Sequence, residues 1–421
     1  MMRVAFIQAN NDKNAQYAAP LWPAYLKAYA EKYVQAEWCV VQDHSELAPL
    51  RPDVVAISSM SQDWPLAKEI IEAGKKIGSR VIVGGHHVTG TRHQSGEGYE
   101  TVIGPGEAPF ARLLTGDMSI PAPGHMDDIP IPDHGFGRLA GHKPTIMTSR
   151  GCSFKCSFCS PKTMWEKIQF HSARRVVDEI QQIRESFPNM KRLSIWDDLF
   201  AAKQSRVREI HNLMREEGIK IKMNSSMRAE LVTESNARLW KSLGLTRLGI
   251  GGESGSNRIL KRLKSPAASV EINQNALDIM HEHGMAIGTG IIFGCPTETE
   301  EDVIATYEWL LKNYRAGKLM NHEVNILTPM PGTPVWFEAE RNGHVCEYDN
   351  FDWSRLRYHS LTSQKTWMGL REKVNSVYLN EATLPQETLY EMIEHYENKI
   401  RWCSPAQIVR GAKRMVERCL T

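Results

Sequence analysis

Hydrophobic and polar positions in the first third of the chain alternate between two patterns. Short apolar runs predict strands at 3–8, 38–42, 53–58, 80–84 and 101–103. Stretches of helical spacing separate them, at about 20–34, 66–77 and 107–114. Strands that alternate with helices in this way predict a parallel sheet with helices on both faces, the doubly wound, Rossmann-like α/β arrangement. Ligands of such sheets bind beyond the carboxyl ends of the strands.

From residue 144 the alternation resumes with a longer spacing. Apolar runs predict six further strands, at 145–149, 193–196, 219–224, 246–251, 286–293 and 323–327. A helix at about 172–187 separates the first two of these strands. Polar residues gather where the strands end, and this is where barrel enzymes place their active sites.

Composition shifts divide the chain into four predicted parts. The parts are 1–118, 119–141, 142–340 and 341–421. The second part is a linker with four prolines, which favour extended chain and mark domain boundaries. The last part predicts a mainly helical C-terminal region, with helices at about 385–402 and 405–418 after an aromatic-rich stretch that we expect to pack against the barrel.

Bulk composition is that of an ordinary globular protein. The 421 residues are 42% hydrophobic and 24% charged, and the chain is too long for one compact core. A net charge of +2 argues against nucleic acid as a partner and favours a small molecule or a peptide as substrate. No apolar stretch approaches the roughly 18 residues that span a membrane. Met1-Met2-Arg3 leads into an apolar strand and not into a signal peptide, so we expect a cytoplasmic protein.

Three of the eight cysteines stand close together and carry the strongest chemical signal in the chain. Cys152, Cys156 and Cys159 form a C-x-x-x-C-x-x-C run just after the predicted strand at 145–149. Three thiolates can hold three irons of a [4Fe–4S] cube and leave the fourth iron open, whereas closed clusters use four cysteines. A structural zinc site would need a second Cys/His pair nearby, and a disulfide would need an oxidising compartment. The sequence indicates neither of these alternatives.

This cysteine motif resembles that of the radical S-adenosylmethionine (SAM) superfamily, and the six strand–helix units resemble its open (βα)6 partial TIM-type barrel. The resemblance implies that the open iron binds SAM and passes one electron into the sulfonium. The bond to the 5′ carbon then breaks and releases a 5′-deoxyadenosyl radical, which abstracts hydrogen from an unactivated C–H bond. The cofactor supplies this chemistry, and the protein supplies position and protection from side reactions. An electron donor such as flavodoxin or ferredoxin is implied.

The same resemblance assigns candidate SAM contacts to the strand ends of the barrel. Phe158 is implied to pack against the adenine, and Glu253 and Ser254 to hydrogen-bond the ribose or the methionyl group. Arg228 offers a guanidinium fork to the methionyl carboxylate. Glycines complete the predicted set because they let the backbone approach a cofactor. They are Gly252 and the glycines from Gly288 to Gly294, which are implied to let the strand at 286–293 lie close under the adenine. The alternatives are a rim ion pair for Glu253 or Arg228 and core packing for Phe158.

Two acidic residues end the second predicted barrel strand. Asp197 and Asp198 stand where the family commonly has a polar strand end. The alternative role is to cap the helix that follows, which is a common use of Asp ahead of a helix.

The N-terminal part resembles the cobalamin-binding domain of one large radical SAM subfamily. Gly84-Gly85-His86-His87-Val88-Thr89 and Gly104-Pro105-Gly106-Glu107 carry this resemblance. The predicted cobalamin contacts are residues at strand ends: Ser58, Gly84, Gly85, His86, Gly104, Gly106 and Glu107. The first strand leads into Gln8-Ala9-Asn10-Asn11 instead of the Asp-x-His-x-x-Gly motif that supplies a lower cobalt ligand elsewhere. Several members of the subfamily also lack that motif. A domain that only braces the barrel is the alternative.

Together the two resemblances imply a cobalamin-dependent radical SAM enzyme and favour a C-methyltransferase. One SAM would methylate reduced cobalamin and a second would be cleaved at the cluster, after which the substrate radical would take the methyl group from methylcobalamin. Cyclisation, ring contraction, oxidation or heteroatom exchange with the same cofactors is an alternative, as is a radical enzyme without cobalamin. A methylthiotransferase is disfavoured because a second cysteine triad is lacking, and a non-catalytic sensor because it needs no SAM pocket. No catalytic residue, substrate or oligomeric state follows from the sequence.

Overall fold

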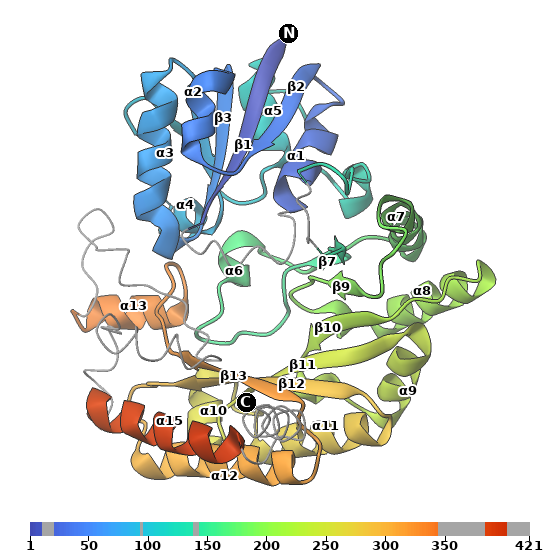
Figure 1. The fold of residues 1–421 in the computed structure, drawn as a ribbon, viewed down its shortest axis with the longest axis vertical. Coiled ribbons are helices and arrows are strands. Elements are labelled where there is room, and N and C mark those ends of the chain that lie inside the picture. The colour runs from blue at the N-terminus through green and yellow to red at the C-terminus, as the bar shows by residue number, and fades with distance from the viewer. Residues whose placement is uncertain (11–20, 93–95, 138–142, 344–383, 402–421) are drawn as a thin grey trace, which may run out of the picture.

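The computed structural model describes residues 1–10, 21–92, 96–137, 143–343 and 384–401 of the chain. These residues form two parallel sheets, one above the other in Figure 1, with the cysteine loop in the space between them. No helix in the described ranges is long and apolar enough to cross a membrane.

The N-terminal sheet has the strand order β2-β1-β3-β4-β5, and all its strands are parallel. Its strands are β1 (Met2–Ala9), β2 (Ala36–Val41), β3 (Val54–Ser59), β4 (Arg80–Gly84) and β5 (Glu100–Thr101). Successive residues of a strand point to opposite faces of the sheet. Phe6 therefore packs against α1 (Leu21–Ala30) and α5 (Glu107–Thr115) on one face, and Ile7 packs against α3 (Trp64–Lys76) on the other. The predicted doubly wound sheet is confirmed.

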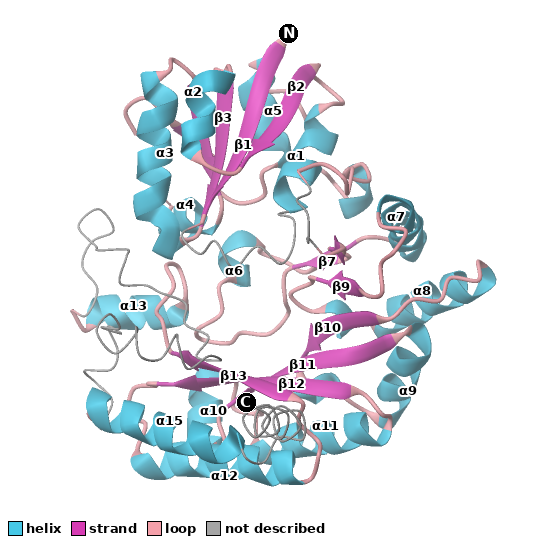
Figure 2. Ribbon diagram, viewed as in Figure 1, coloured by secondary structure: helices cyan, strands magenta, loops and turns pink. Residues whose placement is uncertain are grey.

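The second sheet is also parallel and has the order β13-β12-β11-β10-β9-β6. Its strands are β6 (Thr145–Ile146), β9 (Leu193–Ile195), β10 (Met223–Met227), β11 (Leu245–Glu253), β12 (Ala286–Phe293) and β13 (Asn321–Ile326). The helices on its outer side are α7 (Ala173–Ser186), α8 (Gln204–Glu216), α9 (Glu234–Leu243), α11 (Val270–Glu282) and α12 (Glu300–Arg315). Figure 2 shows these helices on the convex side of the curved sheet, which leaves the concave side open. The six strands confirm the predicted partial barrel.

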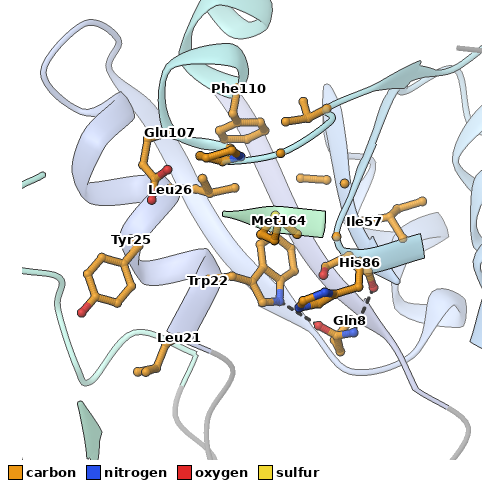
Figure 3. A pocket seen from close by; sticks show the side chains of 18 of the residues that line it. Gln8, Leu21, Trp22, Tyr25, Leu26, Ile57, His86, Glu107, Phe110 and Met164 are labelled. Carbon is orange, nitrogen blue, oxygen red and sulfur yellow. Dashed lines mark hydrogen bonds between the residues drawn. The ribbon is translucent and has the colours of Figure 1, made fainter. Parts of the chain in front are cut away.

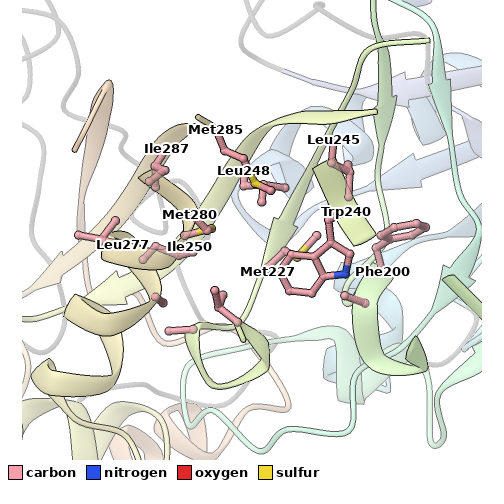
Figure 4. Packing of buried hydrophobic residues seen from close by; sticks show 14 of the residues in the cluster. Phe200, Met227, Trp240, Leu245, Leu248, Ile250, Leu277, Met280, Met285 and Ile287 are labelled. Atoms are coloured by element: carbon pink, nitrogen blue, oxygen red, sulfur yellow. The ribbon is translucent and has the colours of Figure 1, made fainter. Parts of the chain in front are cut away.

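The core of the barrel lies between the sheet and this outer layer of helices. Trp240 of α9, Met280 of α11 and Leu248 of β11 are buried in one hydrophobic cluster, as Figure 4 shows. Burying a side chain of this size stabilises the fold by roughly 1.5–3 kcal/mol. The core therefore holds the strands in register without filling the concave side of the sheet.

The barrel strands expected at 145–149, 219–224 and 246–251 have different limits in the structure. The run at 145–149 is interrupted, because the backbone N–H of Thr148 donates to the Asp197 carboxylate instead of continuing the ladder. Ser149–Arg150 then forms β7, which pairs antiparallel with β8 (Gln169–Phe170). The strand expected at 219–224 lies at β10, since the polar residues after Met223 pair with β11. The strand expected at 246–251 continues to Glu253.

Several short helices connect these elements. They are α2 (Leu47–Leu50), α4 (His86–Thr91), α6 (Pro161–Met164), α10 (Asn257–Leu263) and α13 (Pro334–Arg341). Helix α13 follows the barrel in sequence, yet its Val335 and Trp336 are buried in the core of the N-terminal sheet. The packing of α13 joins the two halves of the protein, which are the N-terminal sheet with its helices and the barrel. The predicted domain boundaries stay a prediction.

The C-terminal region is described for one helix, α15 (Gln386–Arg401). It packs on α12, with the rings of Tyr307 and Tyr396 stacked at 4.8 Å. The helix predicted at 405–418 and most of the aromatic-rich stretch lie outside the described residues.

The linker between the sheets is held by buried polar contacts. His134 Nε2 lies 2.9 Å from Glu179 Oε1 on α7, and the hydroxyl of Tyr25 donates to the same oxygen at 3.0 Å. Arg175 of α7 donates to the carbonyl of Ile129 at 2.6 Å. These contacts fix the N-terminal sheet above the barrel, so the carboxyl ends of its strands face the cysteine loop (Figure 1).

Candidate functional site

The cysteine loop runs from β7 to α6 and is anchored by three contacts. Ser157 N–H donates to the carbonyl of Leu263 at 2.8 Å, and the N–H of Val335 donates to the carbonyl of Ser157 at 3.1 Å. Arg228 Nη1 donates to Cys156 Sγ at 2.7 Å, and its guanidinium lies 4.1 Å from the ring centre of Phe154. The loop is therefore held by α10, α13 and the end of β10.

Of the three cysteines of the loop, Cys152 and Cys156 are half-buried and Cys159 is exposed. Burial raises the pKa of each thiol, and that of Cys159 reaches about 12 because Cys156 and Cys152 add negative charge beside it. Metal binding reverses this effect, since a coordinated thiol is deprotonated. In the described part of the chain no three His, Cys, Asp or Glu side chains converge on a single metal ion. Three soft sulfur donors spread along one loop fit an iron–sulfur cube, whose irons each take one thiolate.

Asp197 and Asp198 hold the strand that leads into the loop. Asp197 accepts from the N–H of Thr148 at 2.5 Å and from the hydroxyl of Ser149 at 2.7 Å. Asp198 accepts from the N–H of Gly151 at 2.7 Å. Burial raises the pKa of both carboxyls. The helix-capping alternative is wrong, because the next helix starts after Lys203 and takes no side-chain bond from either aspartate.

A cavity of about 560 Å³ lies on the concave side of the barrel sheet and is called here the barrel cavity. Among the predicted residues that line it are Phe158, Cys159 and Glu253. Glu253 has a positive φ of 57°, a conformation that costs about 1–3 kcal/mol and is retained mainly at functional positions. Burial raises the pKa of its carboxyl, and Lys264 partly offsets this effect.

Four other predicted SAM contacts do not line the barrel cavity. A Cβ at Gly252 would lie 2.4 Å from Thr289 Oγ1, on the side where Trp309 packs. Ser254 is buried with its hydroxyl 3.2 Å from that of Thr306 on α12. Gly294 donates its N–H to Glu298 at 2.6 Å. Arg228 forms an ion pair with Glu230 besides its bond to Cys156. Direct contact of these four residues with SAM stays a prediction.

A second cavity, of about 420 Å³, lies where the N-terminal sheet faces the barrel and is called here the upper cavity. All seven predicted cobalamin contacts line it, namely Ser58, Gly84, Gly85, His86, Gly104, Gly106 and Glu107. Tight packing explains one glycine, since a Cβ at Gly85 would lie 2.8 Å from Ser58 Oγ and φ is 99° there. Gly104 has a φ of 79° and no atom within 4 Å of the Cβ position, so it leaves open space for a ligand.

Figure 3 shows how side chains shape one wall of the upper cavity. Trp22 Nε1 donates to Gln8 Oε1 at 2.8 Å, and Gln8 Nε2 donates to the carbonyl of Ser58 at 3.0 Å. His86 lines the same cavity, and its Nδ1 is buried without a partner among the described residues. Burial lowers the pKa of His86, so its imidazole is neutral at pH 7. A mainly apolar wall, an open glycine edge and an unpartnered imidazole nitrogen fit a large ring such as cobalamin.

The sequence did not point to the residues that complete this cavity from the barrel side. They are Met147, Arg150, Met164, Trp165 and Trp196. Trp196 is 52% exposed, which is unusual for so large an apolar side chain and is a signal visible only in the structure. The sequence also did not point to three residues of β13 that line the barrel cavity, Asn321, Glu323 and Asn325. Polar residues at every second position of a strand indicate one polar face, and this signal could have found them.

Removing one partner of the buried ion pair between the halves is expected to destabilise the protein strongly. Arg150 Nη1 lies 2.6 Å from Glu107 Oε1, with side chains 6% and 5% exposed. The Glu107→Ala variant leaves a buried guanidinium unpaired, and we expect it to lower the free energy of unfolding by about 3–5 kcal/mol. Glu37→Ala breaks the exposed pair with Arg3 and is the control, with an expected change of about 0–1 kcal/mol. Urea unfolding of both variants measures the difference, and equal midpoints contradict the prediction.

Two family models match this chain. The profile of the Radical SAM superfamily matches residues 146–310, and that of the B12 binding domain matches residues 15–114. An uncharacterised methyltransferase of Pyrococcus horikoshii is 27% identical over 389 residues, which is 82% of either chain. The bacteriochlorophyllide d C-12(1)-methyltransferase of Chlorobaculum tepidum is 26% identical, over 78% of this chain and 74% of its own. The fold is similar to that of TsrM from Kitasatospora setae with cobalamin and a [4Fe–4S] cluster bound, with a TM-score of 0.68 and 16% identity over 96% of this chain and 90% of that one.

Proposed function

We propose that this chain, a radical SAM enzyme with a cobalamin-binding domain, is a C-methyltransferase that acts on an unactivated carbon. One observation carries the proposal: the segment from Arg150 to Met164, which contains the cysteine loop, borders both cavities. Phe158 and Cys159 line the barrel cavity, while Arg150 before the motif and Met164 after it line the upper cavity. A substrate held beside this loop lies within reach of both cofactors, which is the positioning that methyl transfer between them requires. The methyltransferases found among the relatives support the same reaction.

The bound groups supply the difficult chemistry: the cluster delivers the electron that cleaves SAM to a 5′-deoxyadenosyl radical, and cobalamin carries the methyl group. The residues of this chain position these groups. Arg228 donates to the thiol of Cys156, and hydrogen bonds to a ligating sulfur tune the reduction potential of a cluster. Glu253, kept in a strained conformation, presents a carboxylate to the barrel cavity at the end of β11. The buried pair of Glu107 and Arg150 fixes the upper cavity against the loop.

The reductant and the location are proposed with the function. The family needs an external one-electron donor, and we expect flavodoxin or ferredoxin in the cytoplasm. Reduction of the cluster by purified flavodoxin with its reductase, followed as loss of visible absorbance, tests the donor. A cluster that only dithionite reduces contradicts it.

The test of the proposal is anaerobic reconstitution with iron, sulfide and hydroxocobalamin, followed by a visible spectrum of the desalted protein. We expect stoichiometric corrinoid bands above the iron–sulfur shoulder. With reductant and SAM, the protein should then form 5′-deoxyadenosine and S-adenosylhomocysteine, and the second product marks use of the methyl group. An iron–sulfur spectrum without retained corrinoid contradicts methyl transfer through cobalamin.

Filling the upper cavity is expected to remove cobalamin and leave the cluster. A Cβ at Gly84 meets only Val102, at 3.7 Å, so valine fits the end of β4 while its methyl groups take up cavity space. We expect Gly84→Val to weaken cobalamin binding by about tenfold or more, or at least about 1.4 kcal/mol. Gly124→Val is the matched control, because Gly124 is exposed in the linker and lines neither cavity. Equilibrium dialysis measures how tightly the Gly84→Val and Gly124→Val variants bind hydroxocobalamin. Equal binding by the two variants contradicts the assignment of this cavity to cobalamin.

A further inference from the structure

The barrel cavity extends well below the cysteine loop, because four strand positions that face it are glycine. The register of the strands places Ser226, Gly249, Gly288 and Asn321 side by side across β10 to β13. The next layer towards the strand ends is Gly251, Gly290 and Glu323, also side by side. Barrels normally fill such layers with bulky branched side chains. Here the layers leave a slot, and we call it the glycine slot.

One glycine of the slot, Gly290, leaves space that no described residue fills. No atom lies within 4 Å of a Cβ placed on Gly290, and its φ is not in the left-handed region. A larger residue would therefore fit the backbone at Gly290, and strand interiors favour larger residues by roughly 0.5–1 kcal/mol. At Gly288 the Cβ position is 2.9 Å from Asn321 Oδ1, so the amide of Asn321 lies over that glycine. Packing of the fold does not explain an empty position at Gly290.

The far wall of the slot is one polar face of β13. Asn321, Glu323 and Asn325 alternate with outward residues, as shown by His322, which bonds Tyr314 and Glu397 on the helix side. Asn325 is only 9% exposed, and its Oδ1 has no hydrogen-bond partner among the described residues. A buried acceptor without a partner costs about 1–3 kcal/mol, so this oxygen indicates a ligand that donates a hydrogen bond.

The charge of the barrel cavity has one sign. Its described lining holds two carboxylates, Glu253 and Glu323, and no Lys, Arg or His. Lys264 lies near Glu253 and offsets part of its charge, whereas the Glu323 side chain has no ion pair or hydrogen bond in the described ranges. Glu253 lies at the end of the cavity shared with Phe158 and Cys159, and Glu323 lies at the opposite wall. The wall at β13 is thus acidic, rich in acceptors and separate from the cysteine loop.

We propose that the glycine slot is the substrate chamber and that it takes a substrate with a protonated amine or guanidinium group. Glu323 pairs with the cation, and Asn325 accepts a hydrogen bond from it. The carbon to be methylated then extends from the slot towards the cysteine loop. This assignment of a substrate class rests on the proposed function, and it makes Glu323 and Asn325 specificity-determining residues for that reaction.

The test uses matched probes and the reconstituted protein saturated with S-adenosylhomocysteine, which occupies the SAM end of the cavity. The probes are tritiated benzylamine, benzyl alcohol and benzoate, which share a ring and differ in charge. In equilibrium dialysis we expect benzylamine to bind at least about tenfold more tightly than the other two, the ratio of one charge-assisted contact. Equal binding of the three probes, or tighter binding of benzoate, overturns the proposal.

Two variants locate the binding. Glu323→Gln should reduce benzylamine binding to the level of benzyl alcohol, and Asn325→Asp, which adds a second carboxylate, should increase it. Glu308→Gln removes a charge from an exposed position on α12 and should change nothing. Retained benzylamine binding in Glu323→Gln, or a loss of SAM binding in that variant, overturns the assignment of Glu323 to substrate. These experiments measure binding and not turnover. If the protein fails to transfer a methyl group, that result therefore counts against the proposed function and leaves the binding results unaffected.

Discussion

The Cys159→Ala variant is expected to lose the iron–sulfur cluster and all reductive cleavage of SAM. Cys159 is one of three thiols on a single loop, and it is the one that lines the barrel cavity. Replacing groups that only support a metal ligand already costs about 10–100-fold in affinity or activity, so loss of a ligand itself should exceed about a hundredfold. Iron content after anaerobic reconstitution and the rate of 5′-deoxyadenosine formation measure the two losses.

The control for this variant is Cys39→Ala. Cys39 lies on β2, where its thiol donates to the carbonyl of Val4 and packs against the core of the N-terminal sheet, so its removal should leave iron content and cleavage unchanged. Cobalamin retention should survive in both variants because the upper cavity contains neither cysteine. Cluster retention in Cys159→Ala would show that the three-cysteine assignment is wrong.

The Gly290→Val variant is expected to reduce methyl transfer strongly while leaving the fold intact or slightly more stable. The side chain enters open space in the glycine slot, and a β-branched residue suits a strand. We expect the free energy of unfolding to rise by about 0.5–1 kcal/mol and substrate turnover to fall by about a hundredfold, a barrier increase of roughly 2.7 kcal/mol. Urea unfolding measures the expected gain in stability, and turnover assays measure the expected loss of activity.

A second glycine provides the contrast for this prediction. Gly317, after the end of α12, also has no atom within 4 Å of its Cβ position, but its φ is 68°. Gly317→Ala should therefore destabilise the protein by about 1 kcal/mol through backbone strain and leave turnover unchanged. Undiminished turnover in Gly290→Val would show that the slot does not hold the substrate.

Local patterns in the sequence were sufficient for both sheets and for the cluster loop. The apolar runs of β1, β4 and β12 are recognisable because a buried strand needs continuous apolar residues whatever its partners are. The three cysteines are recognisable because their spacing is a property of one short loop. The glycine motifs that line the upper cavity, at Gly84-Gly85 and Gly104-Pro105-Gly106, were found for the same reason.

Predictions that depended on long-range packing were less complete. Ser254 was expected at the cofactor, but its hydroxyl lies beside Thr306 of α12, 52 residues away, and no local pattern announces that partner. The bonds of Asp197 to Thr148 and Ser149 were not predicted either, because they join segments that are neighbours only in the folded sheet. These bonds also explain why the predicted strand at 145–149 is interrupted.

The sequence by itself therefore determined the two folds, the loop of candidate cluster ligands and the strand ends that line the upper cavity, since each follows from residues a few positions apart. Only the tertiary structure decided that the segment from Arg150 to Met164 borders both cavities, and that Arg150 beside the barrel pairs with Glu107 of the N-terminal domain. It also decided that glycines of β11 and β12 stand in line with the polar face of β13. The reason is physical: the register between strands is set by the packing of the whole sheet and its helices, and a chemical environment made by four strands exists only once that register is fixed.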